Sequence, residues 1–197
     1  MKPVRLLICL AALLPAAALA NPDRINEIIT GNCALCHGLE GESASPVFPR
    51  LAAQHPEYMT KQLKDFRDGR RKATTMNSMA AELKNDEIVA LANYYAKKKA
   101  APHALAEPDL AAVGRYIYEK GNKFTAVPSC ASCHGANGYG TAQLPRLAGQ
   151  NAQYLETQMK EFNQRVRTND NAVMHTIAAK LSELETAAVA QFMSGLD

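Results

Sequence analysis

One five-residue pattern occurs twice in this chain, and its residue types point to a specific chemical function. It consists of two cysteines three positions apart, with a histidine directly after the second. The copies are Cys33-Ala34-Leu35-Cys36-His37 and Cys130-Ala131-Ser132-Cys133-His134. Cysteines at this spacing lie about one helical turn apart, on the same side of a helix. Both thiols can therefore form thioethers with the two vinyl groups along one porphyrin edge, while the adjacent imidazole coordinates the iron. The pattern predicts two covalently attached c-type haems.

Three other uses of paired cysteines have to be weighed against haem. A thioredoxin-like redox pair, half of a zinc site and a disulfide all use cysteines at comparable spacing. None of these uses requires a histidine directly after the second cysteine, and this chain has that histidine twice, as His37 and His134. Haem attachment is therefore the favoured interpretation.

Each haem needs a second axial ligand, and the mature chain offers six methionines for this role. Met76 and Met174 are favoured because they follow their histidines by 39 and 40 residues and lie in polar segments that we expect to be loops. Met79 is the competitor for the first haem, but it aligns with the apolar Ile177, which favours core packing. The remaining methionines fall on apolar helix positions and are expected in the core: Met59, Met159 and Met193.

Histidines could also supply the second axial ligand. His175 follows Met174 directly and stays as a minor alternative, although the matching position in the first half is Asn77. His55 and His103 have no counterpart in the other half and are expected on the surface. Ligation by histidine and methionine leaves no open coordination position, which favours one-electron transfer over chemistry on a bound substrate.

A long internal repeat accounts for most of the chain. Cys33 and Cys130 are 97 residues apart, and the positions that follow them match at offsets of 96 to 98. Two copies with one haem motif each indicate a duplicated domain. We predict domains at 21–100 and 109–197 with a linker at 101–108. The matching pairs are Pro49/Pro145, Arg50/Arg146, Leu51/Leu147, Ala52/Ala148, Gln54/Gln150, Tyr58/Tyr154, Gln62/Gln158, Phe66/Phe162, Met76/Met174, Leu83/Leu181 and Tyr94/Phe192.

The periodicity within each half is helical, and no stretch alternates as a strand would. The fold class is therefore all-α. Helices are expected over 23–30, 57–68, 108–120 and 151–163, with further helices that begin at Asn85 and after the capping-box spacing of Ser182 to Glu185. The lysines of 97–99 are best explained as the end of a helix, where cations are favourable; a docking patch is the alternative.

The first twenty residues have the pattern of a secretory signal peptide. Lys2 and Arg5 precede an apolar run that ends in the small residues Ala18-Leu19-Ala20. A transmembrane anchor is disfavoured because the run is short for a bilayer. Cleavage of 1–20 would leave the mature chain in the periplasm, which is the compartment in which bacteria attach c-type haem. The formal net charge of +3 at pH 7 is too small to indicate nucleic-acid binding.

Taken together, these motifs resemble the dihaem cytochrome c4 family over essentially the whole mature chain. The resemblance implies two class I cytochrome c domains around a pseudo-twofold axis, with haem propionates near the interface. It implies that Pro49 and Pro145 accept a hydrogen bond from the ligating imidazoles. Arg50 and Arg146 either serve the propionates or are solvated.

The same resemblance places Gly114 where the first helix of the second half crosses the last helix, beside Phe192. The segment 123–128 has no counterpart in the first half and departs from the twofold pattern. The haem ligands that the family pattern implies are the residues already named: Cys33, Cys36, His37 and Met76 in the first half, and Cys130, Cys133, His134 and Met174 in the second.

Three functions from different classes remain open. The leading one, which the resemblance implies, is a non-enzymatic carrier of single electrons in a respiratory chain, between a quinol–cytochrome c reductase and a terminal oxidase, with at most peripheral membrane association. A second is an electron-accepting dihaem subunit of a dehydrogenase. The third is a dihaem enzyme such as a peroxidase, which would need an open iron and is disfavoured by the aligned methionines.

Overall fold

The computed structural model of the chain describes residues 20–43 and 45–197, and these residues are helical apart from loops and one isolated bridge between Asn122 and Val127. The all-α prediction is confirmed. The predicted signal peptide, 1–20, lies outside the described residues except for Ala20. No helix in the described part of the chain is long and apolar enough to cross a membrane.

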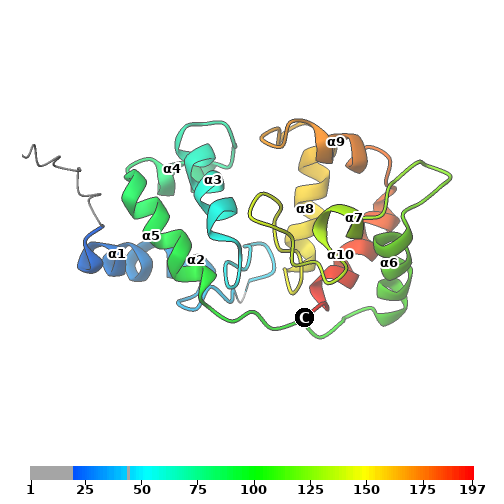
Figure 1. Cartoon of the computed structure of the whole chain (residues 1–197), viewed down its shortest axis with the longest axis horizontal. Coiled ribbons are helices and arrows are strands. Elements are labelled where there is room, and N and C mark those ends of the chain that lie inside the picture. The colour runs from blue at the N-terminus through cyan, green and yellow to red at the C-terminus, as the bar shows by residue number, and fades with distance from the viewer. Residues whose placement is uncertain (1–19, 44) are drawn as a thin grey trace, which may run out of the picture.

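The helices form two groups that lie side by side, joined by an extended segment that runs along one edge of both (Figure 1). The first group contains α1 (Pro22–Ile28), the π-helical turn η1 (Ile29–Cys33), α2 (Ala34–His37), α3 (Pro56–Arg67), α4 (Thr74–Ala80) and α5 (Asn85–Ala96). The second contains α6 (Pro108–Lys120), α7 (Ala131–His134), α8 (Ala152–Asn163), α9 (Val173–Ala178) and α10 (Glu183–Ser194).

Local sequence explains where the longer helices begin and end. Proline occupies the first turn of α1, α3 and α6, where its missing N–H is not needed. The predicted capping box at α10 is present: the Glu185 N–H donates to the Ser182 hydroxyl at 3.2 Å, and the Ser182 N–H donates to the Glu185 carboxylate at 2.8 Å. Helix α5 begins at Asn85 as predicted and ends at Ala96, with Lys97 as its C-cap.

The segments around Met76 and Met174 are short helices, α4 and α9, so the prediction of loops was wrong. Short polar side chains supply the hydrogen bonds that start these helices. The Asp170 carboxylate accepts from the Met174 N–H at 2.6 Å, and the Asn77 side chain accepts from the Ala73 N–H at 2.8 Å. The polar composition that suggested loops therefore belongs to helix starts and exposed helix faces.

The hydrophobic cores differ between the halves. In the second half, α6, α8 and α10 bury one continuous cluster that includes Tyr118, Leu155 and Met193. The first half has two smaller clusters, one around Leu91 and one around Tyr95. The core of the first half is therefore more divided than that of the second.

Helices α6 and α10 cross at Gly114, as the resemblance implied, but the partner at the crossing is Ala188 and not Phe192. A Cβ atom on Gly114 would lie 1.9 Å from the Ala188 carbonyl oxygen, so only glycine permits this approach. Phe192 packs instead on Tyr118, one turn further along, with ring centroids 5.3 Å apart.

The two halves meet through contacts that are reciprocal. The Gln54 side-chain amide donates to the Arg146 carbonyl at 3.0 Å and accepts from the Arg146 N–H at 2.8 Å. Gln150 makes the same two bonds with Arg50, at 2.9 and 2.7 Å. These contacts preserve the pseudo-twofold relation. The segment 123–128 lies at the far end of the second half and does not interrupt it (Figure 1).

Candidate haem sites and the interface between them

The two Cys-x-x-Cys-His motifs lie on short helical turns. Cys33 ends η1 and Cys36 lies in α2, while Cys130 directly precedes α7, which contains Cys133. All four thiols are free. Burial raises the pKa of Cys33 and of Cys130 to about 11, so both are protonated at neutral pH, unlike the thiolate of a reactive redox pair. The described residues contain no group of three or more His, Cys, Asp or Glu side chains placed to hold a metal ion.

The histidine of each motif is buried, with one ring nitrogen committed to a backbone partner. The Nδ1 atom of His37 lies 2.9 Å from the Pro49 carbonyl oxygen, and that of His134 lies 3.3 Å from the Pro145 carbonyl oxygen. The hydrogen bond that the resemblance implied is therefore present in both halves. Burial lowers the pKa of both histidines, which keeps the rings neutral. Donation from Nδ1 leaves the lone pair of Nε2 free for a metal ion.

The two aligned methionines occupy equivalent places. Met76 lies in the first turn of α4 and Met174 in the first turn of α9, and both are half-buried. Met79 is 47% exposed, so the expectation that it packs in the core was wrong. The other methionines are where they were expected. Met59 and Met193 are buried, and Met159 packs against the core of the second half.

His175 has the same structural role as Asn77 of the first half. The His175 Nδ1 atom lies 2.9 Å from the Phe162 carbonyl oxygen, and the Asn77 amide donates to the equivalent Phe66 carbonyl at 2.6 Å. Each side chain thereby ties the methionine-bearing helix to the end of the preceding long helix. This equivalent hydrogen bond explains the position of His175 without ligation of a haem iron.

His55 and His103 were expected on the surface, but both are half-buried at the junction of the two halves. The His55 Nε2 atom lies 2.6 Å from the Tyr139 carbonyl oxygen, across the interface. His103 lies in the linker, where its backbone N–H donates to the Ser194 carbonyl at 2.9 Å, close to the end of α10. Burial and the nearby charge of Arg50 lower the pKa of His103. The linker is therefore packed against the second half.

Arg50 and Arg146 contact protein groups and are not free in solvent. The Arg50 guanidinium donates to the Gly149 carbonyl at 2.5 Å and also to the Ala101 carbonyl, so it bridges the first half, the linker and the second half. The Arg146 guanidinium stacks on the Tyr139 ring, 4.4 Å from its centroid, and donates to the Ala148 carbonyl at 3.2 Å. The Arg50 side chain therefore belongs to the interface, whereas the Arg146 side chain packs within its own half.

A second pair of arginines, which the sequence reasoning missed, forms the centre of the interface. Arg71 donates to the Gln62 side-chain oxygen at 2.9 Å and, across the interface, to Gln158 at 2.6 Å. Arg167 donates to the same two oxygens, at 3.2 Å for Gln62 and 2.8 Å for Gln158. Tyrosines complete the arrangement: Arg71 donates to the Tyr154 hydroxyl at 3.0 Å and Arg167 to the Tyr58 hydroxyl at 2.9 Å.

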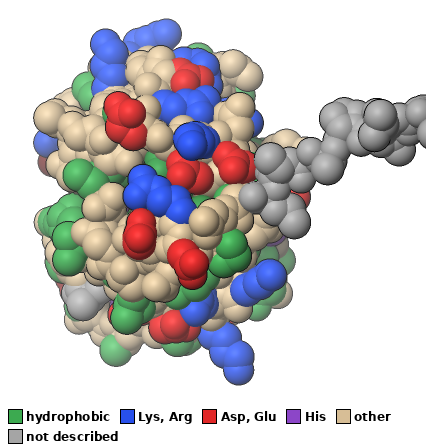
Figure 2. Space-filling view, turned by 90° about the vertical axis from the view of Figure 1, so that its left-hand side faces the viewer, with side chains coloured by type: hydrophobic (Ala, Val, Ile, Leu, Met, Phe, Trp, Pro, Cys, Tyr) green, Lys and Arg blue, Asp and Glu red, His purple; other side chains and the backbone are tan. Residues whose placement is uncertain are grey.

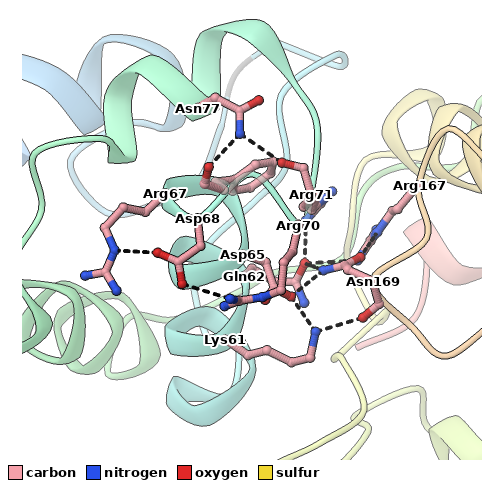
Figure 3. Close-up of polar contacts among 11 residues, drawn as sticks. Lys61, Gln62, Asp65, Arg67, Asp68, Arg70, Arg71, Asn77, Arg167 and Asn169 are labelled. Carbon is pink, nitrogen blue, oxygen red and sulfur yellow. Dashed lines mark hydrogen bonds and ion pairs between the residues drawn. The ribbon is translucent and has the colours of Figure 1, made fainter.

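Figure 3 shows part of this network, with Arg71 and Gln62 of the first half facing Arg167 and Asn169 of the second. Both arginine residues are buried, at 7% exposure for Arg71 and 6% for Arg167. Within the described residues neither guanidinium forms an ion pair with a carboxylate. Burying a cation without an anion is unfavourable, and here the glutamine and tyrosine oxygens offset part of that cost.

The repeat contains a signal that would have identified these arginines. Arg71 and Arg167 are 96 residues apart, the same offset as Tyr58 and Tyr154. Each also stacks on the phenylalanine of its own half, Phe66 or Phe162, with 4.5 Å to the ring centroid. Extending the alignment past the long helices would have shown the pair, although not that the two residues meet.

Comparisons with known proteins agree with this geometry. The family model described as cytochrome c matches the chain twice, over residues 23–117 and 118–197. The chain is 43% identical to cytochrome c4 of Thiocapsa roseopersicina over 185 residues, 92% of this chain and 95% of that protein. It is 38% identical to the thiosulfate dehydrogenase electron acceptor of Stutzerimonas stutzeri (strain A1501), over 83% of this chain and 78% of that protein.

A solved structure also matches the whole arrangement. The crystal structure of reduced recombinant cytochrome c4 from Pseudomonas stutzeri superimposes with a TM-score of 0.83 at 32% sequence identity. The match covers 91% of this chain and 100% of that one. Both halves and their relative placement therefore correspond to a known arrangement.

Proposed function

Because the chain belongs to the dihaem cytochrome c4 family, with two tandem class I cytochrome c domains and two covalently bound haem c groups, we propose that it carries single electrons between membrane-bound complexes of a respiratory chain. The donor in this proposal is a quinol–cytochrome c reductase and the acceptor is a terminal oxidase. The observation that carries the proposal is the equivalence of the two sites, each with a buried, oriented histidine and an aligned methionine.

The residues proposed to hold the haems are those of the repeated pattern. The haem iron supplies the one-electron redox couple. Two cysteines in each half would hold the porphyrin through thioethers, and one histidine and one methionine in each half would bind its iron. The first set is Cys33, Cys36, His37 and Met76, and the second is Cys130, Cys133, His134 and Met174.

The surrounding residues would keep these ligands in place while the charge of the site changes. The carbonyls of Pro49 and Pro145 hold the histidine rings in one tautomer and one orientation. The buried guanidinium groups of Arg71 and Arg167, which both donate to Gln158, would supply positive charge for the propionates at the interface. A rigid ligand set lowers the reorganisation that accompanies electron transfer, which suits a carrier better than an enzyme.

The domain bounds remain part of the proposal: 21–100 and 109–197, with 101–108 as linker. The packing of α6 on α10 supports the placement of α6 in the second domain. The periplasm is the proposed location, after removal of 1–20. Partners in this proposal are redox proteins, without nucleic acid and with at most peripheral membrane contact.

A second candidate function has a specific observation in its favour. The chain is similar to a protein named as the electron acceptor of thiosulfate dehydrogenase. In that function the chain would receive electrons directly from a dehydrogenase.

The outer face of the first half carries interspersed Lys/Arg and Asp/Glu side chains (Figure 2), which favours a partner of mixed charge over one of a single sign.

The ligand set can be tested in the purified oxidised holoprotein. Two equivalents of the weak red charge-transfer band of methionine-ligated ferric haem are expected per chain. Met76→Leu is expected to remove one equivalent, and Met79→Leu, at an exposed position three residues away, none. An open haem in the unaltered chain would contradict the carrier and favour an enzyme.

Kinetics of reduction separate the two candidate donors. Stopped-flow mixing of the oxidised holoprotein with a quinol–cytochrome c reductase, and separately with a thiosulfate dehydrogenase plus thiosulfate, measures both rates. The carrier proposal expects the faster reduction by the reductase. Faster reduction by the dehydrogenase would support the second candidate.

A further inference from the structure

Tyr95 in α5 has a buried polar atom that nothing else in its surroundings explains. Its side chain is 2% exposed, and its hydroxyl has no hydrogen-bond partner among the described residues. Buried hydroxyl groups in folded proteins are almost always paired, because leaving one unpaired is unfavourable. Its neighbour Tyr94 shows the usual arrangement, with its hydroxyl donating to the Leu39 carbonyl at 3.0 Å.

The surroundings of the Tyr95 ring place it beside the first haem-binding motif. The ring belongs to the cluster that includes Met59 and is packed against Cys33 and Leu51. Cys33 is the side chain of this cluster that haem attachment would use, through its sulfur. Burial raises the pKa of this thiol, and the Tyr95 hydroxyl acts in the opposite direction. The hydroxyl and this sulfur thus belong to one cluster, although no hydrogen bond joins them in the described structure.

The second half has no such group at the equivalent place. Met193 follows Phe192, the counterpart of Tyr94, and therefore corresponds to Tyr95; it lies in the same core cluster as Leu147 and Leu155, with Cys130 against it. The buried tyrosine of this half, Tyr118, comes from α6, and its hydroxyl donates to the Gly135 carbonyl at 2.6 Å. The unpaired hydroxyl is thus a property of the first site alone.

We propose that the Tyr95 hydroxyl donates a hydrogen bond to the Cys33 sulfur in the haem-bound protein and thereby raises the reduction potential of the first haem relative to the second. The inference rests on the proposed attachment of haem at Cys33. A thioether sulfur remains a weak acceptor. A donor directed at it withdraws electron density from the haem, which favours the reduced state; hydrogen bonds near a redox centre are an established means of tuning its potential.

The test is a spectroelectrochemical titration of the Tyr95→Phe holoprotein. One of the two midpoint potentials is expected to shift to a lower value while the other stays unchanged. Tyr94→Phe is the matched control, because it removes a neighbouring hydroxyl that is bonded to a backbone carbonyl, and it is expected to move neither midpoint. Unchanged midpoints in Tyr95→Phe, or an equal shift in Tyr94→Phe, would overturn the proposal.

Measuring the haem content distinguishes a failure of this inference from a failure of the proposed function. The absorbance of the alkaline pyridine adduct counts the haems, and two per chain in both variants are expected. Loss of a haem from the unaltered protein would refute the proposed function itself. If Tyr95→Phe binds haem poorly, resonance Raman spectra of the unaltered protein in H2O and D2O decide instead: one carbon–sulfur stretching band should shift on deuteration, and the absence of any shift rejects the hydrogen bond.

Discussion

Asp65 shows how a single buried carboxylate is kept charged in this protein. It lies in α3 beside the arginine network, where its carboxylate accepts from Arg70 at 2.8 Å, from Asn169 of the other half at 2.7 Å and from Lys61 at 2.5 Å (Figure 3). Burial raises the pKa of Asp65, but these donors outweigh it, so the pKa lies below its ordinary value of 3.8. The charged form is therefore the one that stabilises the fold.

The pH dependence of stability tests this arrangement. Because the pKa is lower in the folded chain, the carboxylate stabilises the fold above about pH 4 and loses this effect as the pH falls through the folded-state pKa. Asp65→Asn is expected to lower the free energy of unfolding at pH 7 by about 1–3 kcal/mol. The difference from the unaltered protein should shrink towards pH 3, as measured by guanidinium titrations followed by circular dichroism.

Asp68→Asn provides the comparison for Asp65. Its carboxylate pairs with Arg67 and Arg70 at the surface, where ion pairs contribute little, so almost no change in stability is expected at either pH. A destabilisation of Asp65→Asn that is equally large at pH 3 and pH 7 would show that the charge is not what matters.

At the scale of elements, the close crossing of α6 and α10 depends on Gly114, which has no side chain. The atoms that a Cβ on Gly114 would meet are backbone atoms of Ala188, which cannot rotate away. Gly114→Ala is therefore expected to destabilise the holoprotein by about 3 kcal/mol, at the upper end of the usual range for overpacking. Urea denaturation followed by circular dichroism measures the effect.

Gly31 in η1 is the matched control for the helix crossing. A Cβ there has no neighbour within 4 Å, so Gly31→Ala should leave stability unchanged or raise it by up to about 1 kcal/mol through helix propensity. Equal stability of Gly114→Ala and the unaltered protein would mean that the helices can separate without cost.

Element boundaries were largely predictable because their causes are local. The proline starts, the capping box of α10 and the first turn of α5 are encoded within a few residues. The part of η1 after Thr30 and the short helices α4 and α9 were not predicted. Their hydrogen bonds depend on side chains such as Asn77 and Asp170, which equally favour loops, and the surrounding packing decides between the two.

At the scale of the molecule, the glutamines of the repeat join the two halves. Gln54→Leu combined with Gln150→Leu removes the four hydrogen bonds that these side chains form across the interface and leaves backbone groups of Arg146 and Arg50 unpaired. Each unsatisfied buried group costs about 1–3 kcal/mol, so the halves should lose their coupling. Calorimetry is expected to show one unfolding transition in the unaltered holoprotein and two in the double variant.

Gln153→Leu serves as the control for the interface, because Gln153 lies on the exposed side of α8. It should unfold in a single transition like the unaltered protein. A single transition in the Gln54→Leu, Gln150→Leu double variant as well would show that other contacts, such as the arginine network, are sufficient to couple the halves.

By itself the sequence determined the all-α class, the duplication and the two haems, because motif spacing and periodicity are local properties of the chain. Only the tertiary structure decided what the repeated residues face. The repeat shows that Arg71 and Arg167 occupy equivalent positions, but not that their guanidinium groups share Gln62 and Gln158 across the interface. That depends on how the halves are oriented in space, and the packing of the linker on the second half also leaves His103 half-buried, although it was expected on the surface.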